Sequence, residues 1–212
     1  MFFHNTTTPA ALALASVLWA TPALSEDVTI FDMETYCGDE QSLSVCAERE
    51  MTRTYNGLTQ GHRRKGMDHL QANPDVADRS ADIIPMLIET DQQTLAEVVE
   101  TGVLQTETGA QPVETVDDGI AWADAFYYQL VVNARFEKTE RMLTDLIYTI
   151  NQCDAGSYQG EICATIAAVE TSADHLQVRL DYLQQVKQER NQEFRDLVTQ
   201  YSDVPEQRLS AL

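Results

Sequence analysis

The sequence is short of basic residues, and this shortage excludes several classes of partner. Fourteen lysines and arginines stand against thirty-four aspartates and glutamates, so the 212 residues carry a formal net charge of −20 at pH 7. Duplex nucleic acid and anionic membrane surfaces are themselves negatively charged and repel such a chain. We therefore expect no nucleic-acid partner, and a basic protein becomes the candidate partner.

Histidine is scarce too, and the common catalytic and metal-binding motifs are missing. H-E-x-x-H, E-x-x-H, G-x-S-x-G, Walker A and G-x-G-x-x-G patterns do not occur. After residue 25 the only histidines are His62, His69 and His175, which leaves little material for a catalytic triad or a histidine-ligated metal. On one helix, His62 and His69 would lie about 10 Å apart, too far to hold one ion. We expect a non-catalytic protein without a metal or cofactor.

One carboxylate pair offers the remaining candidate for catalysis. Glu170 and Asp174 are spaced i, i+4, so on one helix they would share a face and could bind a cation or exchange protons. The alternative is an ordinary solvated helix face, which is the commoner use of such a pair. Asp75, Asp78 and Asp82 do not have the spacing of an EF-hand loop.

Long hydrophobic runs are also absent. Residues Ala10 to Ala20 form an apolar run of eleven residues, too short to cross about 30 Å of hydrocarbon as a membrane anchor. The run precedes Ala23-Leu24-Ser25, a small-residue pattern typical of secretory-signal cleavage, although no lysine or arginine precedes it. We predict a signal peptide at 1–25, a single helical domain at 26–212, and a periplasmic or secreted protein without membrane insertion.

The four cysteines are Cys37, Cys46, Cys153 and Cys163. An even number of cysteines in an exported protein favours disulfide bonds, with three pairings to choose from. Neither spacing is C-x-x-C, so a thioredoxin-like redox centre or a zinc ribbon has no support.

Helical periodicity dominates the C-terminal half. From Ile162 to Tyr201, apolar residues recur in an alternating four-three pattern that predicts one long helix with a coiled-coil-like seam. Lys187 and Arg190 interrupt the seam, so either the helix runs past its partner there or the cations meet acids across it. A second stripe predicts a helix over 115–151, and the short turn at 154–157 makes the two helices antiparallel neighbours.

The N-terminal half has weaker patterns. Apolar spacing predicts helices over 43–71 and 80–104, separated by Asn73-Pro74-Asp75, and the stretch from Gln105 to Thr115 is predicted to be a loop. Four amphipathic helices favour an all-α fold, an antiparallel four-helix bundle whose two long C-terminal helices form a coiled-coil-like hairpin.

The predicted bundle also ranks the cysteine pairings. In up-down-up-down order, the start of the first helix and the last hairpin lie at opposite ends, roughly 50 Å apart. Disulfide Cα atoms lie within about 7 Å of each other. The bundle therefore favours the local pairs Cys37 with Cys46 and Cys153 with Cys163.

Charge is distributed unevenly along the chain. Ser80 to Ala134 contains ten acids and no lysine or arginine, whereas positive charge is concentrated at His62-Arg63-Arg64-Lys65. An acidic face could steer and dock a cationic partner. The alternatives are solubility in a saline habitat or neutralisation of the basic cluster within the bundle.

Aromatic residues cluster on the helix predicted at 115–151. Trp122, Phe126, Tyr127 and Tyr128 fall within two turns and point in more directions than one apolar stripe absorbs. They are candidate ligand or contact residues, with core packing as the alternative.

The cysteine pairs carry a slight family resemblance. Cys37-x8-Cys46-Ala47 and Cys153-x9-Cys163-Ala164 form a faint internal repeat. Both resemble the small exported helical domain of the LprI-type lysozyme inhibitors over two short stretches, without that family's later Trp, Arg and Cys signature. The resemblance implies inhibition of a cationic cell-wall enzyme, and no residue roles transfer with it.

Together these patterns predict a non-catalytic exported helical-bundle protein that acts through protein–protein contacts, with a cationic partner docked on an acidic face. Two alternatives stay open at this point: a periplasmic small-ligand-binding or sensory bundle, and an inhibitor of a cell-wall-degrading enzyme. The oligomeric state is left open.

Overall fold

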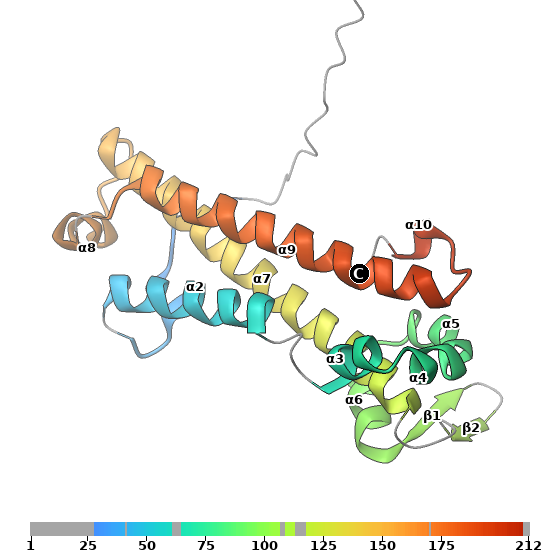
Figure 1. Cartoon of the computed structure of the whole chain (residues 1–212). Helices are drawn as coiled ribbons and strands as arrows, with labels where there is room; N and C mark the ends of the chain where they lie inside the picture. The colour runs from blue at the N-terminus through green and yellow to red at the C-terminus, as the bar shows by residue number, and fades with distance from the viewer. Residues whose placement is uncertain are drawn as a thin grey trace, which may run out of the picture.

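The computed structural model describes residues 28–40, 42–60, 65–106, 109–112, 118–169 and 171–209. The predicted signal peptide and His62 to Arg64 of the basic cluster lie outside these residues. The described chain is mainly α-helical, as predicted (Figure 1). Its elements are α1 (Met33–Cys37), α2 (Leu43–Gln60), α3 (Lys65–Ala72), α4 (Pro74–Arg79), the 3-10 turn η2 (Ala81–Ile83), α5 (Ile84–Leu87), α6 (Gln92–Thr101), β1 (Val103–Thr106), β2 (Gly109–Pro112), α7 (Asp118–Asp154), α8 (Glu161–Val169), α9 (Ala173–Tyr201) and α10 (Glu206–Leu209).

The predicted helix at 115–151 is α7, and α9 lies antiparallel to it, as predicted. The α7 ring of Phe126 meets Phe194 of α9 edge to face with centroids 5.1 Å apart. Further along α7, Glu140 accepts a hydrogen bond of 2.7 Å from Gln184 Nε2. Because one residue number rises as the other falls, the two helices run in opposite directions.

Helix α2 packs against both long helices, but in a direction the sequence analysis did not predict. Its Thr54 hydroxyl lies 2.8 Å from that of Thr139, and its Gly57 carbonyl accepts from Tyr128 of α7 at 2.9 Å, so α2 and α7 are antiparallel. Between α2 and α9 the residue numbers of contacting side chains rise together, from Glu48 with Arg179 to Tyr55 with Tyr182. The two helices are therefore parallel. In an up-down-up-down bundle the first and fourth helices are antiparallel.

The expectation that the two cysteine pairs lie at opposite ends of the molecule is therefore wrong. Figure 1 shows the start of α2 and α8 at the same end, and the disulfide of Cys37 with Cys46 ties α1 to the start of α2. The reason is that the chain between α2 and α7 does not return along α2. It folds instead as α3 to α6 around the other end of α7, which these helices contact.

Two hydrophobic cores follow from this arrangement, and α7 and α9 contribute to both. The tryptophan core lies among α3 to α7 and the end of α9, and its largest buried side chains include Leu70, Ile84, Leu87, Leu95, Trp122, Phe126 and Phe194. The disulfide core lies among α1, α2, α7, α8 and the start of α9, and it includes Cys37, Leu43, Cys46, Met51, Leu58, Phe136, Leu143, Leu146, Leu180 and Leu183.

The predicted continuous helix from Ile162 to Tyr201 is wrong, because it is two helices. Helix α8 ends at Val169, and α9 begins at Ala173 with Ser172 as its N-cap. The Ser172 hydroxyl accepts a hydrogen bond of 3.2 Å from the backbone N–H of His175, which favours a new helix start over continuation. The apolar period continues across the break and conceals it.

The two N-terminal helices predicted from apolar spacing are also divided. The helix over 43–71 is α2 and α3, and the helix over 80–104 is η2, α5 and α6. Asp91 starts α6 by accepting from the backbone N–H groups of Gln93 and Thr94 at 2.9 and 3.0 Å. Gly102 ends α6 with a left-handed φ of 70°, a conformation that glycine adopts without steric cost.

The stretch from Gln105 to Thr115 is not simply a loop. Its first part belongs to the antiparallel hairpin of β1 and β2, in which Val103 pairs with Pro112 and Thr106 with Gly109. Each strand has four residues, too few for a two-residue alternation to stand out in the sequence.

The two cations that interrupt the predicted seam have different partners. Lys187 lies 4.5 Å from the centre of the Phe136 ring of α7, so an aromatic face replaces the expected acid. Arg190 pairs with Glu193 of its own helix at 2.6 Å. Beside them, Gln129 of α7 donates to Asn191 of α9 at 2.7 Å. A polar layer therefore separates the two cores.

The first described residues are tied to α7 by a buried carboxylate. Asp145 is 3% exposed and accepts from the backbone N–H and hydroxyl of Thr29, each at 3.1 Å, and from the Tyr36 hydroxyl at 2.5 Å. Burial, together with this hydrogen bond, raises the pKa of Tyr36 to about 12. Three donors compensate the cost of burying the charge.

We expect Asp145→Ala to lower the free energy of unfolding by about 2–3 kcal/mol, because it leaves the donors of Thr29 and Tyr36 without their acceptor. Urea unfolding followed by the fluorescence of Trp122 measures the loss. Glu100→Ala, at an exposed position of α6, is the control and changes stability by less than about 0.5 kcal/mol. Equal stability of the two variants would contradict the structural role of Asp145.

Candidate interaction surface

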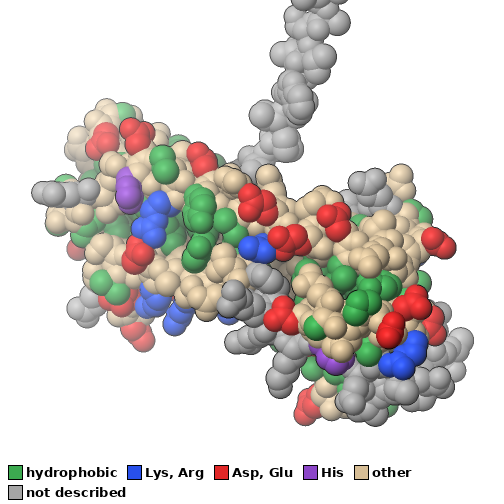
Figure 2. Space-filling view, viewed as in Figure 1, with side chains coloured by type: hydrophobic (Ala, Val, Ile, Leu, Met, Phe, Trp, Pro, Cys, Tyr) green, Lys and Arg blue, Asp and Glu red, His purple; other side chains and the backbone are tan. Residues whose placement is uncertain are grey.

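A groove lined mainly by apolar and aromatic side chains runs along the surface between α2 and α9. It has a volume of about 420 Å³ and is lined by Met51, Thr52, Tyr55, Val178, Arg179, Tyr182 and Leu183. Val178 is 67% exposed, Tyr182 51% and Tyr55 37%, whereas Met51 and Leu183 are buried at the floor. Figure 2 shows hydrophobic side chains reaching the surface where α9 and α2 lie side by side. Three of the exposed large hydrophobic side chains of the described residues therefore gather at this groove.

Helical spacing and the parallel packing of α2 and α9 build this groove. Met51 and Tyr55 are one turn apart on α2, and Val178 and Tyr182 are one turn apart on α9. The parallel arrangement brings the two pairs together, and the rings of Tyr55 and Tyr182 stack with centroids 5.9 Å apart and an interplanar angle of 27°. A hydrogen bond with Tyr55 is the main cause that raises the pKa of Tyr182.

An ion pair closes one side of the groove. The guanidinium of Arg179 binds both carboxylate oxygens of Glu48, with Nη2 donating to Oε1 at 3.0 Å and Nη1 donating to Oε2. The hydrogen bond lowers the pKa of Glu48 and raises that of Arg179. The two-point geometry links α2 to α9 across the groove and neutralises both charges.

Further acidic residues stand on the exposed turns of α9 beside the groove. Asp174, Asp181 and Glu189 are all exposed. Asp181 and Glu189 accept from the neutral side chains of Gln177 and Gln185, at 2.7 and 2.9 Å, so these contacts leave their charges in place. With Glu48 and Arg179 paired, this rim is negatively charged.

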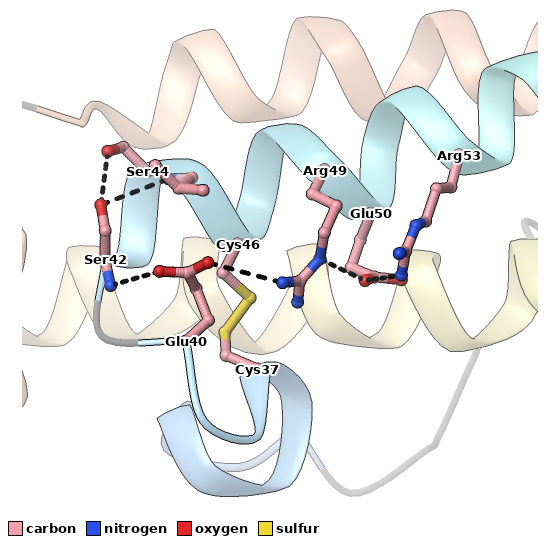
Figure 3. Close-up of polar contacts among 9 residues, drawn as sticks. Cys37, Glu40, Ser42, Ser44, Cys46, Arg49, Glu50 and Arg53 are labelled. Carbon is pink, nitrogen blue, oxygen red and sulfur yellow. Dashed lines mark hydrogen bonds and ion pairs between the residues drawn. A yellow bond between two sulfur atoms is a disulfide. The ribbon is translucent and has the colours of Figure 1, made fainter.

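The disulfide between Cys37 and Cys46 fixes the helix that carries half of the groove (Figure 3). Both cysteines are buried in the disulfide core, and their Cα atoms lie 5.6 Å apart. The loop between them is tied down by Glu40, which accepts from the backbone N–H of Ser42 at 3.2 Å and lies 3.6 Å from the guanidinium of Arg49.

Further along α2, a second set of charges pairs off on the helix itself. Glu50 accepts from Arg49 at 3.1 Å and from Arg53 at 3.3 Å, as Figure 3 shows. These pairs lie on the same turns of α2 as Glu48, Met51 and Tyr55.

The second disulfide fixes α8, the helix that precedes the other wall of the groove. Cys153 and Cys163 join the end of α7 to α8, with Cα atoms 5.6 Å apart. Ile166 of α8 is buried in the disulfide core, and the chain enters α9 three residues after α8 ends. The two predicted pairings are thus confirmed, and both act at the end of the molecule where α2 and α9 begin.

The structure places the predicted aromatic residues mostly inside the tryptophan core. Trp122 and Phe126 are 0% and 1% exposed, and Tyr127 is half-buried against the same core. Tyr128 is half-buried with its hydroxyl bonded to Gly57, beside a cavity of about 20 Å³ near Gln129. A cavity of that size holds about one water molecule.

The acids predicted to form one face between Ser80 and Ala134 have several separate roles. Asp91 caps α6, Asp124 accepts from the backbone N–H of Gly66 at 2.9 Å at the start of α3, and Glu89 pairs with Arg208 at 2.8 Å. The exposed acids of this stretch include Asp82, Glu97 and Glu100. The side chains outside the description are those of Glu107, Glu114, Asp117 and Asp118.

Of the carboxylate pair suggested for catalysis, the structure describes only Asp174. Asp174 lies in the first turn of α9, α8 ends before Glu170, and Glu170 itself lies outside the described residues. Of the histidines, His69 is half-buried, His175 is exposed and His62 is not described. No three His, Cys, Asp or Glu side chains of the described segments lie close enough together to hold a metal ion.

The groove itself was not predicted from the sequence. Val178 and Tyr182 lie beside the seam positions Leu176, Leu180 and Leu183, which is the signal that could have revealed it. Helices long and apolar enough to span a membrane are absent from the described part of the chain.

Comparison of the chain with family models, with curated proteins and with solved structures gives no match. The slight resemblance to the LprI-type inhibitors therefore gains no support, and function is inferred from the chemistry of the groove.

We expect Arg179→Gln to raise the pKa of Glu48 toward its ordinary value, because the charged donor that lowers it is lost. A carboxyl group with a lowered pKa stabilises the fold above its unfolded pKa and loses that effect as pH falls through the folded pKa. The variant's deficit is below about 1 kcal/mol at pH 7, since both groups are partly exposed, and it disappears in acid.

NMR titration of the side-chain carboxyl of Glu48 measures this shift. Arg53→Gln is the matched control, because Arg53 pairs with Glu50 and not with Glu48. An unchanged Glu48 titration in Arg179→Gln would show that the ion pair across the groove does not form.

Proposed function

We propose that this chain is an exported, non-catalytic helical protein that acts through protein–protein contacts, and that the groove between α2 and α9 receives a cationic partner. The observation that carries the proposal is the exposed apolar surface of Tyr55, Val178 and Tyr182 beside an acidic rim. Contiguous exposed apolar surface rimmed by polar residues is typical of interaction sites.

Charge supports the choice of partner. The net charge of −20 attracts a basic protein over long range and accelerates its association at low salt. Asp174, Asp181 and Glu189 supply local charges beside the apolar surface. A second copy of this chain would bring the same acids against one another, which opposes self-association.

The disulfides and the leader pattern support export. Disulfide bonds form and persist mainly in oxidising compartments, and four cysteines of this chain pair in two disulfides. The pattern at residues 10 to 25 is that of a cleaved secretory signal. We place the mature protein in the periplasm or outside the cell.

The chemistry of the groove favours binding over catalysis. Its polar groups are the tyrosine hydroxyls, Thr52 and the paired Arg179. A tyrosine hydroxyl is protonated at neutral pH, and the hydrogen bond with Tyr55 raises the pKa of Tyr182 further, so this hydroxyl is a poor base or nucleophile. Inhibition of a basic cell-wall-degrading enzyme is one form that this binding function could take. A small-ligand role for the aromatic residues around Trp122 has less support, because the cavity beside Tyr128 accommodates only about one water.

We expect the purified protein to retain a basic protein from an envelope extract of its source at low salt, and to release it at about 0.5 M salt, where charges are screened beyond a few ångströms. The double variant Val178→Ser, Tyr182→Ala is expected to lose at least about tenfold in retention, because it removes the exposed apolar contacts.

Tyr148→Ala is the matched control, since Tyr148 is a 38% exposed tyrosine that does not line the groove. Quantitative mass spectrometry of the eluates identifies proteins whose recovery differs between the variants. The proposal fails if every retained protein is recovered equally by the double variant and the control.

A further inference from the structure

We infer that the groove between α2 and α9 takes an amphipathic α-helix of the partner, with apolar side chains on one face and lysines or arginines flanking them. The inference rests on the proposed function and specifies the shape and chemistry of what binds. It follows from three properties of the groove: the hydrogen bonding of its backbone, the spacing of its apolar side chains and the position of its charges.

The backbone of the groove walls offers no partner for an added β-strand. Both walls are helices, α2 and α9, whose interior N–H and C=O groups are used within each helix. A peptide that binds by adding a strand needs an exposed sheet edge, and these walls offer none. A helix satisfies its backbone internally and can lie on an apolar surface without unpaired groups.

The apolar spacing of the groove matches one helix face. Tyr55 lies one turn beyond Met51, and Tyr182 lies one turn beyond Val178, so contacts recur about every 6 Å along the groove. A bound helix presents anchors at i, i+3, i+4 and i+7 with the same repeat. The stacked tyrosines are well suited to hold such anchors, because they expose rigid rings and polar tips together.

The rim charges indicate where the partner's cations lie. Asp174, Asp181 and Glu189 are separated by about two helical turns each, or roughly 10–12 Å along α9. Arg179 does not oppose incoming cations, because Glu48 binds it at two points. Basic residues about two turns apart beside an apolar face therefore complement this rim.

The test uses the mature protein with both disulfides intact and a fluorescein-labelled synthetic peptide of leucine and lysine. The peptide has about 18 residues, which spans roughly 27 Å as a helix, with leucines on one face and lysines flanking them. A scrambled peptide of the same composition has the same charge without the amphipathic face. Fluorescence anisotropy measures affinity, and circular dichroism of an unlabelled peptide measures the helix gained on binding.

We expect the amphipathic peptide to bind at least about tenfold more tightly than the scrambled one, and to become helical. Binding weakens about tenfold in the double variant Val178→Ser, Tyr182→Ala and is unchanged in Tyr148→Ala. Equal binding of both peptides, or equal binding to the double variant, would show attraction by net charge alone and would overturn the inference.

Two further outcomes separate this inference from the proposed function. If the double variant loses the natural basic protein but binds the peptide unchanged, the groove is the contact surface and the helical form of the partner is wrong. If sedimentation shows a dimer that Tyr182→Ala dissociates, the groove is occupied by a second copy of this chain and the inference is overturned.

Discussion

The structure depends on the burial of α7 along nearly its whole length. The helix has 37 residues, about 55 Å of rise, and its buried side chains run from Trp122 and Phe126 to Leu143 and Leu146. Burying each of these contributes roughly 1.5–3 kcal/mol, so any arrangement that exposed half of α7 would be severely destabilised. One neighbouring helix cannot cover all sides of it. The rest of the chain is therefore distributed along α7, with α9 on one side throughout and a different set of short helices on each half.

The groove is a consequence of how those short helices are distributed. In a four-helix bundle, a fourth long helix would complete the layer beside α2 and α9. Here the chain between α2 and α7 is used to cover the other half of α7 as α3 to α6. Within the described residues, the outer faces of Tyr55, Val178 and Tyr182 are consequently left exposed. The two disulfides and the ion pair of Arg179 with Glu48 hold the walls in place, so the exposed surface is presented on rigid elements.

The features that the sequence predicted are those encoded locally. The 3.6-residue period predicted α7, the short turn at 154–157 predicted antiparallel packing with the next long helix, and the predicted bundle order favoured the two local disulfide pairs. The pairing prediction was right although its premise of opposite ends was wrong, since local pairs also form when both lie at one end. The break before α9 was missed because the apolar period crosses it and one serine supplies the cap. The direction of α2 was missed because it depends on contacts between distant residues such as Tyr55 and Tyr182.

The candidate site was missed for a related reason. A single exposed apolar residue such as Val178 is ordinary on a protein surface, and only its position opposite Tyr55 makes it part of a groove. The aromatic cluster around Trp122 was predicted as a candidate site because its aromatic residues are densely spaced in the sequence. Density of large apolar side chains on one helix is also what a core requires, and the structure buries Trp122 and Phe126 there. The acidic residues also have two different roles. Asp91 and Asp124 hold helix starts, whereas acids of α9 such as Asp181 remain exposed.

Hydroxyl-radical footprinting of the free and partner-bound protein reports the solvent exposure of individual side chains and so tests whether the groove is the contact surface. In the free protein, we expect strong labelling of Tyr55 and Tyr182 and weak labelling of Trp122. When the basic partner binds, Tyr55 and Tyr182 become protected while Tyr148 is labelled as before. Protection of Tyr182 in the free protein, or no change in its labelling in the complex, would contradict the claim that the groove between α2 and α9 is the contact surface.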